Sequence, residues 1–165
     1  MKILAVSGSL RSASSNSQLL RAVASAAPPE TIVSIFEGIG NLPHFNPDLD
    51  PPEDPAPHPA VAEWRRSLRE SGAVIFSTPE YAHGVPGVLK NALDWIVGSG
   101  ELVGKPVAIF QTSATRGEFA RASLVETLTV MSALVIYSGA PPANDPGSLK
   151  NALRAVAAAV VPELR

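Results

Sequence analysis

Residues 3–16 read ILAVSGSLRSASSN, a short apolar run and then a loop of small polar residues that leads into a helical pattern. The run at residues 3–6 predicts a buried strand, and the apolar residues between 19 and 23 have helical spacing. Free N–H groups at a helix N-terminus point towards an anion, and the helix dipole adds partial positive charge. The order of strand, polar loop and helix start therefore favours a bound anion.

The loop offers several donors that suit a phosphate group. Arg11 has the fork geometry that recognises phosphate oxygens, and hydroxyl or amide donors stand at Ser9, Ser12, Ser14, Ser15 and Asn16. Ser14 or Asn16 can instead cap the helix, because both residue types are common N-caps. The loop lacks the Gly-Lys-Ser/Thr of the Walker pattern and the repeated glycines of the dinucleotide pattern. Phosphate binding and simple capping both stay open at this point.

Composition limits the classes of protein that remain. The chain has 165 residues, 45% hydrophobic and 17% charged, which predicts one folded domain over residues 1–165. The net charge of −2 argues against a nucleic-acid partner. The absence of cysteine excludes disulfides, thiolate metal sites and a cysteine nucleophile. Neither a signal peptide nor a membrane helix is recognised, so we expect a cytoplasmic protein with no membrane partner.

Apolar runs and helical patterns alternate along the chain. Strands are expected at residues 3–7, 31–36, 73–77, 106–111 and 134–137, and helices at 16–27, 59–71, 86–97, 116–131 and from 146 or 147 to 161. Gly72 is expected to end the second helix as a C-cap. The alternation predicts a doubly wound parallel sheet with helices on both faces.

Ligands of such sheets bind beyond the carboxyl ends of the strands, at the switch point between the two halves. The loops after the first, third and fourth strands, residues 8–16, 78–85 and 112–117, are expected there. Residues 37–58 form a long irregular segment, and segments of that length are usually functional or mobile. Its proline-rich part, residues 51–59, either covers the site or is a solvated connection.

A second motif, TPEYAHGVPGVLKNALDW, spans residues 78–95. Pro79 favours an extended backbone, Tyr81 supplies an aromatic ring with a polar tip, and Gly84 and Gly87 allow close backbone approach. A flat aromatic ligand suits such a segment. The alternatives are that Tyr81 packs on the protein itself and that His83 is a solvated loop residue.

Together the two motifs resemble the NAD(P)H-dependent FMN reductase family, which includes quinone, azo-dye and chromate reductases. Residues 42–43 (LP) and 46–49 (NPDL) add to the resemblance, which runs in order along almost the whole chain. It implies a flavodoxin-like fold with strand order 2-1-3-4-5 and FMN at the switch point. It also implies NADPH or NADH as co-substrate, and a homodimer or homotetramer with the helix at 86–95 near the interface.

By this resemblance the FMN phosphate lies on the first loop, and the isoalloxazine ring lies along the third through mostly backbone contacts. The candidate cofactor ligands are Ser9, Arg11, Ser14, Ser15, Asn16, Pro79, Glu80, Tyr81, Ala82, His83, Gly84 and Ser113. No side chain is assigned as catalytic, because the flavin carries the chemistry. Tyr81 and His83 are candidates for tuning the flavin or the acceptor, and the three histidines show no metal-ligand spacing.

The sequence departs from the family pattern in two loops. Ala82 and Gly84 stand where asparagine and serine are usual, and the loop after the fourth strand lacks the usual glycine pair. Arg116 in that loop either meets a nucleotide 2′-phosphate or covers a helix start. The departures bear on the nicotinamide contacts and on the choice between NADPH and NADH.

The expected function is transfer of electrons from NAD(P)H through FMN to a quinone, an azo compound, a metal oxyanion or free flavin, in a ping-pong cycle. The alternative is a non-catalytic FMN-binding electron carrier or regulatory module. Carriers of this kind tend to be strongly acidic, whereas the net charge here is −2. A phosphate-binding protein of the same fold without flavin is a further alternative.

Overall fold

Five parallel strands form the centre of the protein, in a computed structural model that describes residues 1–51, 58–141 and 146–160. The strands are β1 (Lys2–Ser7), β2 (Ile32–Phe36), β3 (Ala73–Ser77), β4 (Pro106–Phe110) and β5 (Leu134–Gly139). Their order in the sheet is β2-β1-β3-β4-β5. This is the order of flavodoxin-like sheets, so the expected fold is confirmed.

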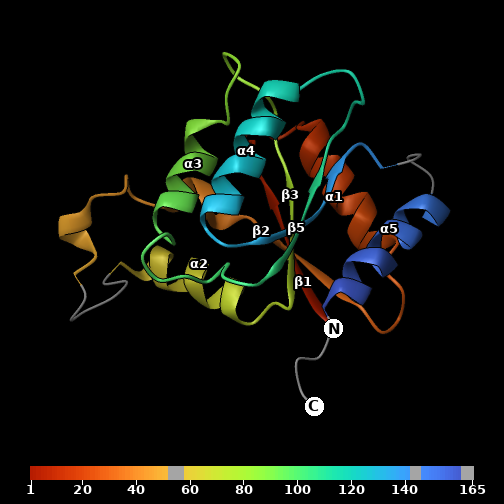
Figure 1. The fold of residues 1–165 in the computed structure, drawn as a ribbon, viewed down its shortest axis with the longest axis horizontal. Coiled ribbons are helices and arrows are strands. Elements are labelled where there is room, and N and C mark those ends of the chain that lie inside the picture. The colour runs from red at the N-terminus through yellow and green to blue at the C-terminus, as the bar shows by residue number, and fades with distance from the viewer. Residues whose placement is uncertain (52–57, 142–145, 161–165) are drawn as a thin grey trace.

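Helices cover both faces of the sheet, as Figure 1 shows. They are α1 (Ser15–Ser25), α2 (Pro59–Arg69), α3 (Gly87–Asp94), α4 (Glu118–Val130) and α5 (Pro146–Ala159). The helices α2, α3 and α4 share one apolar cluster with the sheet, and α1 and α5 share another. None of the helices in the described part of the chain is long and apolar enough to cross a membrane.

Burial follows the position of each strand in the sheet. All five residues of β3 and of β4 are buried, whereas the edge strands β2 and β5 are partly exposed. A strand covered by helices on both faces needs apolar side chains at every position, which is why these two strands read as continuous apolar runs. The predicted bounds of β3 agree with those observed.

The end of α2 differs from the expectation. Gly72 is not the C-cap, because the helix ends at Arg69 and its C-cap is Glu70 in a right-handed conformation. The amino group of Lys105 instead donates hydrogen bonds to the carbonyl oxygens of Leu68 and Ser71, at 2.5 and 2.6 Å. A cation at a helix C-terminus satisfies free carbonyls and interacts favourably with the helix dipole. The expected extension of α5 to residue 161 falls outside the described residues.

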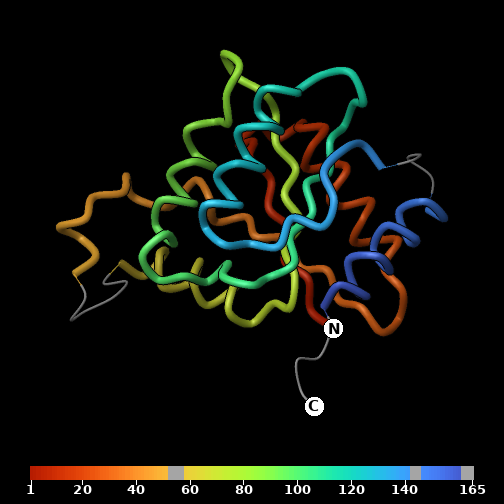
Figure 2. The backbone as a smooth tube through the Cα atoms, in the orientation of Figure 1, coloured from red at the N-terminus to blue at the C-terminus, as the bar shows by residue number. Residues whose placement is uncertain are grey.

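The segment after β2 runs out alongside α3, at one side of the molecule (orange in Figure 2). Two short 3₁₀ turns, Gly38–Asn41 and Pro47–Leu49, interrupt its irregular path. The side chains of Asn91 and Trp95 both donate hydrogen bonds to the carbonyl of Pro43, at 2.9 and 2.8 Å. Part of the second sequence motif therefore anchors this segment. Residues 52–57 lie outside the described residues, so the two interpretations of the proline-rich stretch 51–59, a cover over the site or a solvated connection, both stay open.

Candidate functional site

A cavity of about 530 Å³ lies at the carboxyl end of the sheet, where the loops after β1, β3 and β4 gather at the top of Figure 1. These are the three loops that the strand order predicts at the switch point. The cavity is lined by Ser15, Asn16, Thr78, Pro79, Glu80, Gln111, Thr112, Thr115, Arg116, Gly117, Glu118 and Phe119. Most of the lining residues are of polar type, and Phe119 and Pro79 are the apolar ones.

The N-terminus of α1 opens into this cavity. Ser14 is the N-cap, and its side chain accepts a hydrogen bond from the N–H of Ser17. The N–H groups of Ser15 and Asn16 come first in the helix, where no helical carbonyl is within reach, and the described residues supply no acceptor for them. Of the two capping residues left open by the sequence, Ser14 caps, and two free backbone donors line the cavity.

Gly8 sets the distance between the first loop and β3. Its N–H donates to the carbonyl of Ser77 at 2.9 Å. A Cβ atom at this position would lie 2.2 Å from Oγ1 and 2.8 Å from Cβ of Thr78. Only glycine permits so close an approach. The loop after β1 is therefore held against the neighbouring strand at the point where the cavity begins.

Asn16 has a partner inside the protein. The hydroxyl of Ser77 donates to its amide oxygen at 2.9 Å, and both side chains are buried. The bond ties the first turn of α1 to the end of β3. A side chain expected as a cap or a ligand thus holds the helix N-terminus in place, while its backbone N–H stays free.

The structure places two candidate phosphate ligands in each of two cavities, and the fifth, Ser14, is buried and lines neither. Ser15 and Asn16 line the larger one, whereas Ser9 and Arg11 line a neighbouring cavity of about 190 Å³ together with Arg21. Arg11 is exposed, and its backbone N–H donates a hydrogen bond to the hydroxyl of Ser9 at 3.3 Å. The two groups line separate cavities although they belong to one short stretch of sequence, a division that the sequence pattern alone does not reveal.

The loop after β3 forms a tight hairpin. The N–H of Tyr81 donates to the carbonyl of Gly84 at 3.1 Å, and the reverse bond measures 2.9 Å. Ala82 and His83 turn the chain with φ angles of 49° and 58°. Positive φ at both central residues is the requirement of a type I′ turn. The side chain of Tyr81 is 57% exposed, which contradicts the alternative that it packs on the protein itself.

Two contacts join this hairpin to α4. The carboxylate of Glu80 accepts a hydrogen bond from the N–H of Ala120 at 2.9 Å. The ring of His83 stacks on Phe119, with centroids 4.2 Å apart and an interplanar angle of 16°. His83 is therefore not merely a solvated loop residue, although it is exposed.

The loop after β4 closes the third side of the cavity. The amide of Gln111 donates to the carbonyls of Arg116 and Gly117, both at 3.2 Å, and so shapes the loop. Ser113 accepts a hydrogen bond from the N–H of Thr115 and does not line the cavity. Sequence reasoning chose Ser113 and missed Gln111 and Phe119. The only feature of the sequence that could have indicated these two residues is their position beside a loop already expected at the switch point.

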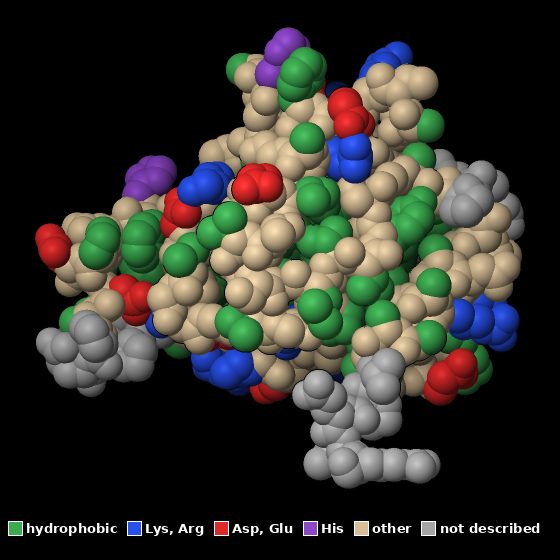
Figure 3. All heavy atoms as spheres, viewed as in Figure 1, with side chains coloured by type: hydrophobic (Ala, Val, Ile, Leu, Met, Phe, Trp, Pro, Cys, Tyr) green, Lys and Arg blue, Asp and Glu red, His purple; other side chains and the backbone are tan. Residues whose placement is uncertain are grey.

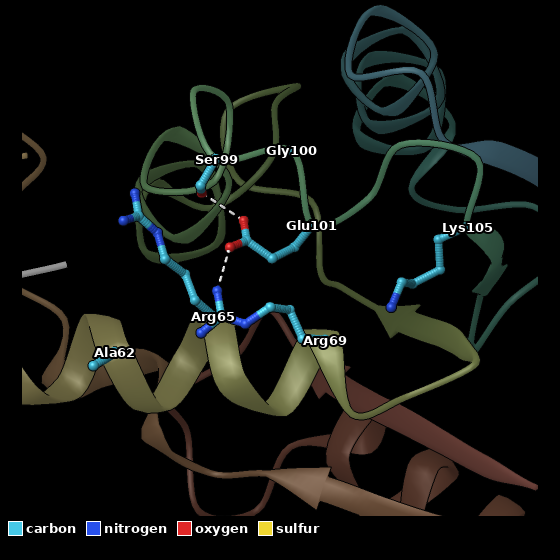
Figure 4. A pocket seen from close by; sticks show the side chains of 7 residues that line it. All are labelled: Ala62, Arg65, Arg69, Ser99, Gly100, Glu101 and Lys105. Atoms are coloured by element: carbon cyan, nitrogen blue, oxygen red, sulfur yellow. Dashed lines mark hydrogen bonds and ion pairs between the residues drawn. The ribbon is translucent and has the colours of Figure 1, made fainter. Parts of the chain in front are cut away.

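A further cavity, of about 700 Å³, lies between α2 and the segment before β4 (Figure 4). The side chain of Glu101 is 2% exposed and accepts hydrogen bonds from Arg69 at 2.9 Å and Ser99 at 2.5 Å. Arg65, also 2% exposed, forms a bidentate ion pair with Asp50. Arg65, Arg69 and Glu101 are thus each in an ion pair, and these pairs connect α2 to its neighbours.

In the described ranges, 1–51, 58–141 and 146–160, no group of three or more histidine, aspartate or glutamate side chains could hold a metal ion. On the face drawn in Figure 3, acidic and basic side chains alternate and form no block of one sign. The candidate site is thus a cavity lined by free backbone donors and by the ring of Phe119, on which His83 stacks.

Comparison with known proteins assigns the chain to a family. The model of the NADPH-dependent FMN reductases matches residues 1–145. The chain belongs to this family. One relative of this chain is an NAD(P)H-dependent FMN reductase of Pseudomonas aeruginosa. The two sequences are 40% identical over 124 residues, which are 74% of this chain and 65% of the relative.

Two further proteins are similar to this FMN reductase family member. A quinone reductase of Pseudomonas putida is 42% identical over 116 residues, 67% of this chain and 59% of the relative. The chain therefore spans about three fifths of the length of these curated relatives. The structure of the flavoenzyme NAD(P)H:(acceptor) oxidoreductase FerB of Paracoccus denitrificans matches with a TM-score of 0.71 at 28% identity, over 96% of this chain and 94% of that one.

Proposed function

We propose that this chain is an FMN-dependent oxidoreductase that passes electrons from NADPH or NADH to a small-molecule acceptor. The observation that carries the proposal is the cavity of about 530 Å³ at the switch point, in a chain that belongs to the FMN reductase family. Its volume is typical of cofactor sites. The quinone reductases among the relatives favour a quinone as acceptor.

The residues that line the cavity fit FMN. The free N–H groups of Ser15 and Asn16 are donors for a phosphate at a helix N-terminus. Ser14 does not line the cavity, but it precedes these two residues, and its hydroxyl accepts the capping bond with its oxygen and keeps its own proton to donate. The extended backbone at Pro79 and Glu80 provides an edge for a flat ring. Ser9, Arg11 and residues 81–84 complete the proposed contacts.

The chemistry that bound FMN supplies is two-electron transfer, by which NAD(P)H, a proton and a quinone become NAD(P)⁺ and a hydroquinone. The chain's own residues bind and orient the FMN. The N-terminus of α1 holds the phosphate, and the loops after β3 and β4 enclose the space that the nicotinamide and the acceptor occupy one after the other. Alternating use of one space is a ping-pong cycle. Azo compounds, metal oxyanions and free flavin are further proposed acceptors.

The same proposal covers the state of the protein. Residues 1–165 form a single FMN-binding domain, it assembles as a homodimer or homotetramer, and it works in the cytoplasm. Chain length and composition support the first point, the family resemblance supports the second, and the lack of a recognised signal peptide in the sequence supports the third. Size-exclusion chromatography with light scattering measures the oligomer directly.

One experiment separates the reductase from its alternatives. The purified protein is reconstituted with FMN, its absorbance spectrum is recorded, and NADPH or NADH is added without oxygen. Rapid bleaching of the flavin band, followed by its return on addition of benzoquinone, is the expected result. Bound flavin that neither nucleotide bleaches identifies a carrier or regulatory module. A protein that takes up no FMN contradicts both functions.

A variant locates the phosphate. Arg11→Ala removes a charge-assisted hydrogen bond, so the Kd for FMN is expected to rise about tenfold or more. Arg154→Ala makes the same change on the exposed face of α5 and leaves the Kd unaltered. An unaltered Kd in Arg11→Ala would leave Ser15 and Asn16, which line the other cavity, as the phosphate ligands. The KM ratio of NADPH to NADH in Arg116→Ala decides between the two roles open to Arg116.

A further inference from the structure

The stacked rings of His83 and Phe119 are an unusual surface feature. His83 lies in the loop after β3 and Phe119 in the first turn of α4, 36 positions apart by their residue numbers, yet the rings are nearly parallel with centroids 4.2 Å apart. The Phe119 side chain is 57% exposed and lines the 530 Å³ cavity. An aromatic face left open to solvent at the rim of a cavity is typical of a binding surface.

Short backbone contacts hold both rings in place. The two hydrogen bonds of the Tyr81–Gly84 hairpin fix the turn that carries His83. The bond from Ala120 to Glu80 fixes the first turn of α4, where Phe119 is the second residue. Each ring is thus within two positions of an anchored residue. Phe119 is therefore a wall of the cavity, and His83 supports its ring from outside the lining.

The rest of the cavity contrasts with this wall. Its other lining side chains include hydroxyl, amide and charged groups such as Thr78, Gln111 and Arg116. A flat apolar face opposite polar groups favours a planar ring with polar substituents, because the ring packs and the substituents accept hydrogen bonds. A compact inorganic ion gains nothing from the aromatic face.

We propose that Phe119 packs against the ring of a planar quinone acceptor and that His83, by stacking on it, is the positioning residue that holds the Phe119 ring. The pair sets the preference for quinones over acceptors without a ring. This inference rests on the proposed reductase function and deepens it, since it names the substrate class of the same cavity. The reaction is the one written above, with two electrons and two protons added to the quinone.

The test compares two acceptors on the FMN-loaded enzyme. Benzoquinone has a flat ring, whereas ferricyanide is an octahedral ion that accepts one electron per ion. Phe119→Leu keeps the apolar character and removes the ring. Its KM for benzoquinone is expected to rise about 3- to 10-fold, the factor that an aromatic pair is worth, with kcat unaltered. Its KM for ferricyanide stays unaltered, and both KM values are measured with FMN at a saturating concentration.

Two further variants complete the design. His83→Ala gives a smaller rise in the benzoquinone KM, about twofold, and His83→Phe restores the wild-type value because the stacked ring returns. Phe45→Leu makes the same substitution on the segment beside α3, where Phe45 contacts Trp95 and does not line the cavity. It changes neither KM.

A readout without activity tests the stack itself. The ring of Phe119 shifts the imidazole proton resonances of His83 upfield in the flavin-free protein, and Phe119→Leu removes that shift. If Phe119→Leu changes the KM for both acceptors equally, or changes neither, the specificity role is overturned while the reductase function stands. An absence of upfield shift overturns the positioning role of His83. Wild-type enzyme that oxidises NAD(P)H with neither acceptor overturns the reductase function and the inference with it.

Discussion

The carboxylate of Glu80 accepts a hydrogen bond from the backbone N–H of Ala120 at 2.9 Å, across 40 positions of sequence. Ala120 lies in the first turn of α4, whose N-cap is Gly117, a residue with no side chain to accept a bond. An anionic acceptor here satisfies a free N–H group and interacts favourably with the helix dipole. Glu80 therefore supplies the cap from another loop and joins two walls of the cavity.

Removal of this cap is expected to cost stability. Glu80→Ala lowers the free energy of unfolding by about 1 kcal/mol, the usual worth of an N-cap, and lowers Tm by about 2–4 °C for a chain of this size. Urea unfolding followed by circular dichroism measures both. Glu126→Ala removes the same charge from the exposed side of α4 and changes stability by less than about 0.5 kcal/mol. A Glu80→Ala protein as stable as that control would contradict the capping role.

Two glycines of the candidate site are expected to respond in opposite ways to alanine. In Gly8→Ala the new Cβ meets Thr78 at 2.2 Å, so the loop after β1 must move away from β3. The expected loss is about 1–3 kcal/mol of stability, as for other overpacked sites, with a raised Kd for FMN. Fluorescence titration with FMN and urea unfolding check the two effects.

Gly87→Ala is the matched change. Nothing lies within 4 Å of a Cβ at Gly87, and its φ is not in the left-handed region. Because Gly87 begins α3, alanine there raises stability by about 0.4–1 kcal/mol through the unfolded chain. If both alanine variants were destabilised equally, the clash at Gly8 would not be the cause.

The strands of the sheet could be predicted from the sequence because each strand is marked by a short run of mostly apolar residues. The apolar run at Ala73–Ser77 predicts a central strand, and the structure buries all five of its residues. Helix ends were less accessible, since they depend on distant partners. Lys105, and not Gly72, satisfies the carbonyls at the end of α2, and it comes from a segment 37 positions away from Leu68.

The candidate site divides in the same way. The three loops could be placed at one edge of the sheet from strand order alone, and they line one cavity. The partners of particular side chains could not be placed. Asn16 bonds Ser77 across 61 positions, and His83 stacks on Phe119 from another loop. Such pairs have no periodicity in the sequence, so only the folded chain reveals them.

The hairpin at the cavity rim stores backbone strain that a single substitution should relieve. Ala82 has a φ of 49°, a conformation in which alanine costs roughly 1–2 kcal/mol. Asparagine tolerates this conformation better and is favoured in type I′ turns. Ala82→Asn is therefore expected to raise stability by about 1 kcal/mol, measured as a higher Tm.

The control for Ala82→Asn is the same substitution in a helix. Ala122 is exposed on α4, where asparagine is a poorer helix former than alanine by about half a kcal/mol. Ala122→Asn should therefore lower Tm. Opposite signs for the two variants identify backbone conformation as the cause, whereas a fall in both would show that the turn does not strain Ala82.

The amino group of Lys105 predicts a dependence of stability on alkaline pH. Burial lowers the pKa of Lys105 from its ordinary value of 10.5, and the nearby charge of Glu101 only partly offsets this. Between the lowered pKa and 10.5, the unfolded chain binds more protons at this site than the folded chain does. The contribution of Lys105 to the free energy of unfolding therefore rises with pH across that window. Below the window the cost of burying the charge is fully present.

Comparison with a variant isolates this effect from the other titrating groups. Lys105→Met keeps a side chain of similar length and removes the titration, so the stability of the wild type minus that of the variant follows Lys105 alone. The neutral amine still has two N–H groups for Leu68 and Ser71, so the cap at the end of α2 persists when the proton leaves. Urea unfolding of both proteins from neutral to alkaline pH should show the difference shifting in favour of the wild type. A constant or opposite trend would mean that burial does not govern the protonation of this group.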